Sequence, residues 1–286
     1  MSSHAKLTRK SILNTRGVAE MAVLAVLSLA AVRTAAQVKA PAAAVPLDQQ
    51  EKFLQTGKIV SQKVLSRGVT KSIRATLSDG KLTHDAHIQM VDKQLVNLYA
   101  PDGTPVPWRD SYKYNIAAYR LLRFLGLDMT PASVERKVSA KPAAITWWAD
   151  DIKMLELDRL RKSIQPPDPK DWERQMSTAR VFDHLIFNID RNLENLAITN
   201  NWKIVLIDHT RAFSAVPKLM NPEDLTMCRR PLFEKIQGLS APAIQDAVNG
   251  YLTKSEIEGI MKRRDLIVQH FKKLIAEKGE AAVLIP

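Results

Sequence analysis

The stretch of sequence that decides the fold prediction covers residues 187–198, which read FNIDRNLENLAI, and continues through residues 203–209, which read KIVLIDH. Just before it, apolar side chains recur at helical spacing from Phe182 to Ile189. We therefore expect a buried helix to lead into this stretch. The polar residues that follow the helix are expected on a short loop rather than on an exposed helix face.

Two apolar runs at residues 196–199 and 203–207 flank a polar turn, and this pattern predicts an antiparallel hairpin. Asn195 stands at the beginning of the first run, and Asp208 follows the second. Antiparallel pairing brings the start of one strand beside the end of the other, so we expect these two side chains to lie next to each other.

Asp190 adds a loop carboxylate five positions before Asn195. A loop carboxylate with an adjacent Asn and Asp forms an oxygen-rich pocket suited to Mg²⁺ or Mn²⁺. Phosphoryl transfer uses such a metal, together with a carboxylate that orients or deprotonates the attacking hydroxyl. Taken singly, each residue has a commoner structural explanation, such as a helix-end ion pair for Asp190 or an Asx turn for Asp208. Their joint order favours the functional interpretation.

The interval from Asp190 to Asn195, followed by the I-D-H of residues 207–209, has the spacing of the catalytic and metal-binding loops of kinases. The pattern resembles the phosphatidylinositol 3-/4-kinase-like superfamily, an atypical kinase fold to which HipA-type and secretory-pathway kinases are distantly similar. The wider pattern, carried by residues 110–119, residues 134–138 and Phe213 after Asp208, also resembles a group of bacterial exported proteins of this class. The resemblance implies that Asp190 is the catalytic base, with Arg191 beside it at a catalytic position. It implies that Asn195 and Asp208 are metal ligands.

The same resemblance implies ATP as a cofactor, with Mg²⁺ or Mn²⁺. Gln89 stands where a cofactor-binding strand residue is expected, and Trp148 and Ala149 belong to residues 147–150, the implied hinge that meets adenine. The implied partners are a nucleotide and a hydroxyl-bearing acceptor of unknown identity. The implied activity is transfer of the γ-phosphate of ATP to a protein or small-molecule hydroxyl.

The wider sequence predicts an α+β class, with a two-lobed protein-kinase-like fold. An Asp-Gly pair at residues 79–80 predicts a hairpin. Either Asp110 or Ser111 is expected to cap a helix that ends at Gly126. Strands are expected at residues 69–77, 83–91, 134–138 and 144–148. Helices are expected at residues 152–160, from Asp171 onward, and at residues 254–261 and 265–276. The expected organisation is a signal peptide (1–36), a linker (37–50), a strand-rich N-lobe (51–149) and a helical C-lobe (150–286).

Two positions depart from the kinase pattern. Kinases use a strand Lys to hold the phosphates and a helix Glu to orient it. Gln89 stands at the expected Lys position, and Asn115 stands at the expected Glu position. No glycine-rich phosphate loop is present either. The alternative is therefore a catalytically inactive kinase-like module of the cell envelope that binds a nucleotide or a partner. A third possibility is a non-enzymatic envelope protein in which the motif is a coincidence.

The N-terminus has the order of a secretory signal: a basic segment, twelve uncharged residues at 21–32 and small residues at 34–36. It predicts an exported, periplasmic or extracellular protein without a stable membrane span after cleavage, since twelve residues are too few to cross a bilayer. An uncleaved inner-membrane anchor is the alternative. The formal charge of +12 falls to +8 without residues 1–36. The remaining basic residues are mixed with acids and lack interleaved aromatics, so we expect no nucleic-acid partner.

Two further features are expected to be structural. Cys228, the only cysteine, has no activating base near it in sequence and is expected to be a packed residue. His84 and His87 form H-x-x-H on a strand, where residues three apart point to opposite faces. A metal ion shared by the two histidines is therefore not expected.

Overall fold

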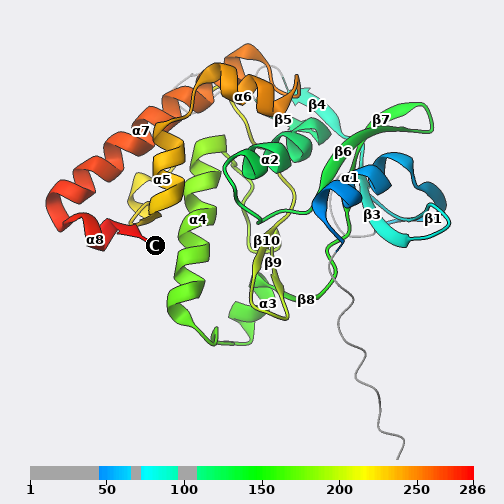
Figure 1. The fold of residues 1–286 in the computed structure, drawn as a ribbon, viewed down its shortest axis with the longest axis horizontal. Coiled ribbons are helices and arrows are strands. Elements are labelled where there is room, and N and C mark those ends of the chain that lie inside the picture. The colour runs from blue at the N-terminus through cyan, green and yellow to red at the C-terminus, as the bar shows by residue number, and fades with distance from the viewer. Residues whose placement is uncertain (1–44, 66–71, 96–107) are drawn as a thin grey trace, which may run out of the picture. The chain divides into compact units, whose positions relative to one another are not determined.

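The structure is a computed structural model that describes residues 45–65, 72–95 and 108–286 of the chain (Figure 1). The predicted signal peptide and most of the predicted linker lie outside the described residues, as does the start of the strand expected at 69–77. No helix of the described ranges is long and apolar enough to cross a membrane.

An antiparallel five-stranded sheet forms the strand-rich half, in the order β1-β2-β3-β7-β6. The hairpin predicted at the Asp-Gly pair is confirmed, since Ser78 lies opposite Thr83, Asp79 accepts the turn N–H groups and Gly80 has a φ of +89°. The strands are β1 (Lys58–Val64), β2 (Ile73–Ser78), β3 (Thr83–Gln89), β6 (Ser133–Val138) and β7 (Lys141–Trp147).

Two helices pack against this sheet. Helix α1 (Leu47–Thr56) contributes Phe53 and Leu54 to the sheet core. Helix α2 (Tyr112–Phe124) begins after Ser111, whose hydroxyl accepts a hydrogen bond from the backbone N–H of Lys113, so Ser111 rather than Asp110 is the cap. Helix α2 contributes Tyr119 to the sheet core, but its leucines pack into the core of the helical half. It therefore belongs to both halves.

A second, small antiparallel sheet has the order β10-β9-β8. The predicted hairpin is confirmed as β9 (Leu196–Thr199) and β10 (Ile204–Leu206). The helix predicted at residues 152–160 is wrong in its first turn. Residues there form β8 (Ile152–Leu155), because this segment pairs with β9, and helix α3 (Glu156–Arg161) starts only afterwards. A further antiparallel pair consists of β4 (Asp92–Leu95) and β5 (Trp108–Ser111).

The remaining chain is mainly helical. The predicted helix at Asp171 begins earlier, because the Asp168 carboxylate caps the backbone N–H groups of Lys170 and Asp171. The two helices predicted at residues 254–261 and 265–276 are one helix, since no breaker separates them. The elements are α4 (Pro169–Ile186), η1 (Pro222–Asp224), β11 (Cys228–Arg229), α5 (Arg230–Gln237), α6 (Ala241–Val248), α7 (Lys254–Lys278), α8 (Glu280–Val283) and β12 (Leu284–Ile285).

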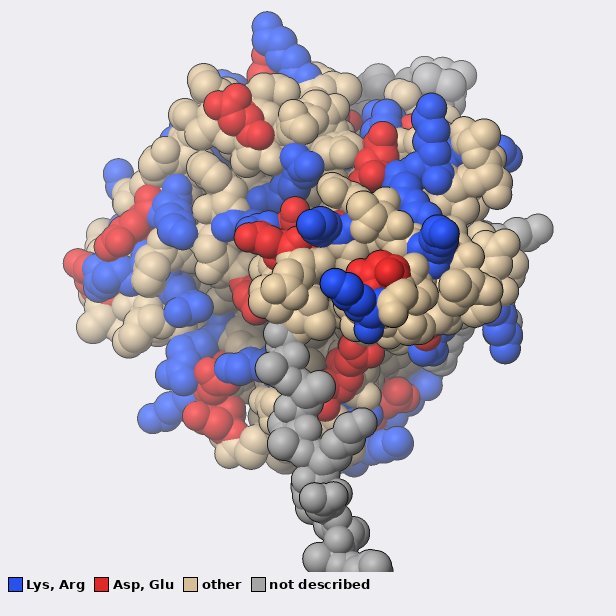
Figure 2. All heavy atoms as spheres, turned by 45° about the vertical axis from the view of Figure 1, so that its right-hand side comes forward, with Lys and Arg blue, Asp and Glu red and all other residues tan. Residues whose placement is uncertain are grey.

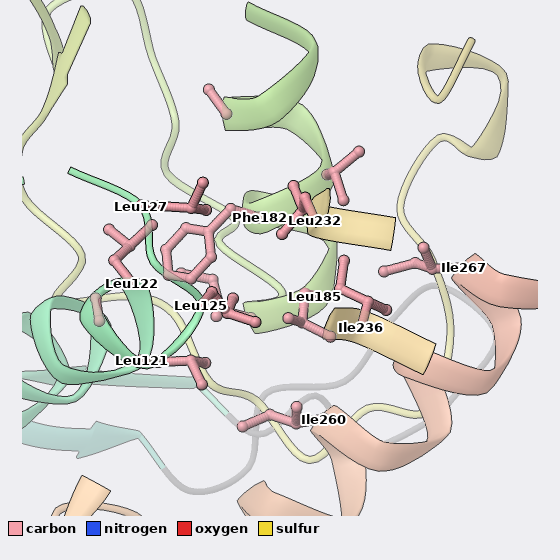
Figure 3. Close-up of a cluster of buried hydrophobic side chains, with 14 of the residues drawn as sticks. Leu121, Leu122, Leu125, Leu127, Phe182, Leu185, Leu232, Ile236, Ile260 and Ile267 are labelled. Atoms are coloured by element: carbon pink, nitrogen blue, oxygen red, sulfur yellow. The ribbon is translucent and has the colours of Figure 1, made fainter. Parts of the chain in front are cut away.

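Apolar side chains from four helical segments interlock in the core of the helical half (Figure 3). Phe182 and Leu185, from the last turns of helix α4, are part of this core. Cys228 is fully buried in this core, and burial raises the pKa of its thiol to about 12, which confirms that it is a packed residue. The other residues labelled in the close-up are Leu121, Leu122, Leu125, Leu127, Leu232, Ile236, Ile260 and Ile267.

The predicted α+β arrangement of a strand-rich and a helical half is confirmed. Basic and acidic side chains are intermingled on the face of the molecule shown in Figure 2. That face carries no continuous basic stripe of the kind that would follow a nucleic-acid backbone.

Candidate functional site

Asp190 lies on a short loop directly after helix α4. The helix ends at Phe187, which has a φ of +52°, and the next residue, Asn188, is buried. The Asn188 side chain donates a hydrogen bond to Asp183 at 3.0 Å and accepts one from the backbone N–H of Asp190 at 3.2 Å. The loop is thus tied to the helix, and the Asp190 side chain stays 33% exposed to solvent.

Arg191 holds this loop against the helix and the hairpin through hydrogen bonds. Its Nε lies 2.9 Å from Asp183 Oδ2, and one Nη donates to the carbonyl oxygens of Asn195 and Ile207, each at 2.7 Å. The other Nη donates to Asp183 Oδ1. The contacts therefore show a positioning role. A catalytic role for Arg191 stays a prediction.

Asn195 and Asp208 lie at neighbouring strand ends, as the hairpin predicts. The backbone N–H of Ile207 donates to the carbonyl oxygen of Asn195 at 3.1 Å, and Asp208 is the next residue. The Asn195 amide Nδ2 donates to the carbonyl oxygen of Asp190 at 3.0 Å. Asp190 is thus joined through Asn195 to the strand end that carries Asp208, and the structure brings the three predicted residues together.

Two side-chain oxygens at these strand ends have no hydrogen-bond partner among the described residues. Asp208 has a φ of +54°, and its Oδ1 accepts a hydrogen bond from the Thr210 hydroxyl at 2.9 Å. Asp208 Oδ2 and Asn195 Oδ1 make no hydrogen bond to the described part of the chain. One carboxylate and one amide suit Mg²⁺ or Mn²⁺, which take further oxygens from phosphates and water. Within the described ranges, no three His, Cys, Asp or Glu side chains gather as a metal site.

The two positions predicted to depart from kinases, Gln89 of β3 and Asn115 of α2, are neutral. Gln89 is 2% exposed and pairs with Ala144 of β7. Asn115 of α2 accepts a hydrogen bond from the backbone N–H of His209 at 2.7 Å. Helix α2 therefore holds the residue that follows Asp208 through an amide rather than through a carboxylate.

The two strand histidines, His84 and His87, have different surroundings. The His84 ring stacks on Trp147, with ring centres 3.6 Å apart. Burial lowers the pKa of His87, and the negative charge of Asp208 works against this shift. His87 was not expected at the site, although its place two residues before Gln89 puts it on the same strand face.

His209 fills space in the core directly behind the site. Its ring is 1% exposed and packs edge-on against Phe182, with ring centres 6.2 Å apart. Burial lowers the pKa of His209 well below its usual 6.5, and the Arg191 charge lowers it further. The side chain is therefore a neutral packing residue at neutral pH.

Arg211 and Asp110 are the charged residues of the site that sequence reasoning missed. Arg211 Nε lies 3.2 Å from Asp110 Oδ2, and Arg211 Nη1 lies 3.2 Å from Asp190 Oδ2. The backbone is fixed next to both residues, because the N–H of Ser111 donates to the carbonyl oxygen of Thr210 at 2.8 Å. The available signal was the position of Arg211, three residues after Asp208.

Trp148 and Ala149 lie in the connection between β7 and β8, where the hinge was predicted. The backbone N–H of Trp148 donates to the carbonyl oxygen of Asp85 at 3.1 Å. The Arg74 guanidinium lies 4.2 Å above the Trp148 ring and is held by the Asp85 carboxylate. The Trp148 ring at the start of this connection therefore lies beside the Arg74–Asp85 ion pair.

No protein-family model and no curated protein matches this sequence. Solved structures do match. The structure of hydra Fam20 with sugar has a TM-score of 0.61 at 15% identity, over 84% of this chain and 92% of that chain. A Golgi casein kinase matches at 0.61 and 12% identity, over 84% and 77% of the two chains. A Golgi casein kinase with Mn/ADP bound matches at 0.59 and 12% identity, over 84% and 78%.

At these identities the likeness concerns the fold, and it confirms the predicted kinase-like fold. The finer assignments, to the phosphatidylinositol 3-/4-kinase-like superfamily and to a bacterial exported branch, stay predictions.

Proposed function

We propose that the chain is a metal-dependent phosphotransferase that moves the γ-phosphate of ATP to a hydroxyl of a protein or small molecule. The observation that carries this proposal is the hydrogen-bonded connection from Asp190 through Asn195 to the strand end with Asp208. It gathers a loop carboxylate and two oxygen ligands at one place in a kinase-like fold. We place this site between an N-lobe of residues 51–149 and a C-lobe of residues 150–286.

In the proposed reaction, the acceptor hydroxyl oxygen attacks the γ-phosphorus of ATP. A new oxygen–phosphorus bond forms, and the bond between the γ-phosphorus and the oxygen bridging to the β-phosphate breaks. The electron pair of that bond leaves on ADP. Asp190 takes the hydroxyl proton, which suits a carboxylate that is 33% exposed on a loop held in place by its backbone.

Asn195 Oδ1 and Asp208 Oδ2 are the proposed metal ligands, and a bound Mg²⁺ or Mn²⁺ would supply positive charge to the phosphate oxygens. We propose that the nucleotide lies along the face of β3 that carries Gln89, with its base near Trp148 and Ala149. The Mn and ADP bound in the matching Golgi casein kinase support this choice of cofactors. Membership of the phosphatidylinositol 3-/4-kinase-like superfamily is part of the same proposal.

A second candidate is a catalytically inactive module that binds a nucleotide or a partner in the cell envelope. The observation that favours it is the pair of neutral side chains, Gln89 and Asn115, where kinases carry Lys and Glu. Under either candidate we propose export directed by residues 1–36, which have the order of a secretory signal.

The test has two stages and uses the full chain. ATP with Mg²⁺ or Mn²⁺ is expected to raise the melting temperature, because a ligand that binds only the folded state stabilises it. Phosphate release and autophosphorylation are then compared for the wild type and Asp190→Ala. We expect the variant to be about 100-fold slower or more, with its thermal shift intact.

The matched control is Asp246→Ala, which removes an exposed carboxylate of α6 away from the site. It is expected to behave as the wild type. Equal rates for the wild type and Asp190→Ala would overturn the role of Asp190. Binding without transfer in the wild type would support the second candidate instead.

A further inference from the structure

We propose that Arg211, held by the buried carboxylate of Asp110, is the cation that binds the phosphoryl group during transfer. The pair would take over the charge role that a strand Lys and a helix Glu have in kinases. This inference rests on the proposed phosphotransfer function and assigns two of its residues.

The Arg211 guanidinium lies between two carboxylates at matched distances. Its Nε is 3.2 Å from Asp110 Oδ2, and its Nη1 is 3.2 Å from Asp190 Oδ2. The side chains of Arg211, Asp110 and Asp190 are 28%, 3% and 33% exposed. The positive charge is therefore buried on the Asp110 side and accessible on the Asp190 side, where the acceptor would approach.

Asp110 has the properties of a fixed counter-ion. A carboxylate this deeply buried needs a charged partner, because a lone buried charge is strongly unfavourable. Its Oδ1 has no hydrogen-bond partner among the described residues, so the ion pair with Arg211 is its main compensation. The Ser111–Thr210 backbone bond and the Asn115–His209 bond fix the two chain segments against each other. Arg211 is thus held in place before any ligand binds.

Two other arginines of the described residues, Arg191 and Arg74, are held by partners of their own. Arg191 uses its guanidinium to hold Asp183 and two backbone carbonyls. Arg74 is held by Asp85 and lies over Trp148 at the connection between the lobes. Arg211 differs from both, because it contacts the proposed base itself.

Contact with the base also determines what Arg211 can reach. A general base lies about 3 Å from the oxygen that it deprotonates, and that oxygen lies about 3–3.5 Å from the phosphorus that it attacks. A guanidinium that donates to the same carboxylate is therefore within reach of the γ-phosphoryl oxygens. Its fork of N–H groups suits phosphate, and its charge would stabilise the negative charge of the transition state.

The experiment compares the full-length wild type with Arg211→Gln, Arg211→Lys, Asp110→Asn and the control Arg180→Gln. Arg180 has the same kind of pairing, with Glu173, on the exposed side of α4. Dissociation constants are measured for Mn²⁺·ATP and Mn²⁺·ADP, and kcat is measured by phosphate transfer. Melting temperatures confirm that each variant is folded.

For Arg211→Gln we expect kcat to fall about 100-fold or more, as when one fixed transition-state donor is removed. ATP binding is expected to weaken about tenfold, with ADP binding within about twofold, because ADP lacks the γ-phosphate. Arg211→Lys keeps the charge but not the fork, so it should retain an intermediate kcat. Asp110 acts by positioning Arg211, so Asp110→Asn should lower kcat by about tenfold. Arg180→Gln should match the wild type.

Equal weakening of ATP and ADP binding, or a wild-type kcat in folded Arg211→Gln and Arg211→Lys, would overturn the inference while leaving the proposed function in place. A wild type that binds neither nucleotide would overturn the proposed function itself. The two failures are therefore distinguishable.

Discussion

The two sides of the site reach their geometry in different ways. On the helical side, Asp190, Arg191 and Asn195 are joined by hydrogen bonds between residues four or five positions apart. On the other side, the contacts bridge distant parts of the chain. The Asn115–His209 bond joins residues 94 positions apart, and the Asp110–Arg211 pair joins residues 101 positions apart.

This difference explains what each side retains of the kinase pattern. The positions of Asp190 and Asn195 depend on the short distance between them along the chain, and this spacing is the one found in the kinase catalytic loop. A long-range charge pair can be replaced by another pair from different elements, provided that it reaches the same place. The helical side is therefore expected to depend on each of its residues, and the other side is expected to accept compensated changes.

The largest effect on stability is expected for Arg191→Leu. This change leaves the buried Asp183 carboxylate with Asn188 as its remaining partner and frees two backbone carbonyls. Breaking a buried ion pair costs about 3–5 kcal/mol, so the urea midpoint should fall steeply at an unchanged m-value.

The control is Arg180→Leu, which breaks the exposed pair with Glu173. Exposed pairs contribute about 0–1 kcal/mol. If Arg191→Leu and Arg180→Leu lower the free energy of unfolding by similar amounts, Arg191 does not hold the loop in place.

The next effect concerns the neutral pair. Gln89→Lys places a charge at a position that is 2% exposed, and we expect a loss of about 2–3 kcal/mol. In kinases the strand Lys is oriented by a helix Glu, so adding Asn115→Glu should recover about 1–2 kcal/mol of this loss. Chemical denaturation of the two single variants and the double variant measures this coupling. Strictly additive losses would contradict the view that this side accepts compensated changes.

A smaller effect is expected for His209→Phe. The Nε2 atom of His209 is buried and makes no hydrogen bond to the described ranges, so an apolar ring of similar shape should add about 1 kcal/mol of stability. The change also tests pH dependence. Burial lowers the pKa of His209 well below 6.5, so below pH 6.5 the unfolded chain binds a proton that the folded chain does not.

Stability therefore falls as the pH drops below 6.5, by about 1.4 kcal/mol per pH unit for each such histidine. His87 and His184 contribute in the same direction, because burial lowers their pKa values too. Chemical denaturation between pH 7 and pH 5 measures how the free energy of unfolding depends on pH. For His209→Phe this free energy should fall less with decreasing pH than for the wild type, by the contribution of one histidine. An unchanged slope would mean that His209 is protonated in the folded protein.

The sequence was sufficient for the local features. Apolar spacing before Asp190 and the runs on either side of residues 200–202 predicted the α4 helix and the β9–β10 hairpin, and these place the three motif residues. Prediction failed where tertiary pairing overrides local pattern. Ile152–Leu155 has apolar residues compatible with a helix, but it adds to the edge of β9 instead.

The remaining parts of the site were invisible for the same reason. Nothing local in the sequence shows that the leucines of α2 pack with the helical half or that Asn115 holds His209. Asp110 was expected only as a possible helix cap, and only the fold brings it to Arg211. A charged pair separated so far along the chain has no periodicity by which to recognise it.

The measurement that tests the central claim most directly is calorimetric titration of ATP into the wild type and Asp208→Asn, with and without Mn²⁺. The substitution keeps the shape of Asp208 and removes the carboxylate proposed as a metal ligand. We expect the wild type to bind ATP much more tightly with Mn²⁺, and Asp208→Asn to lose most of this gain. Equal Mn²⁺ dependence in both proteins, or no ATP binding by the wild type, would contradict it.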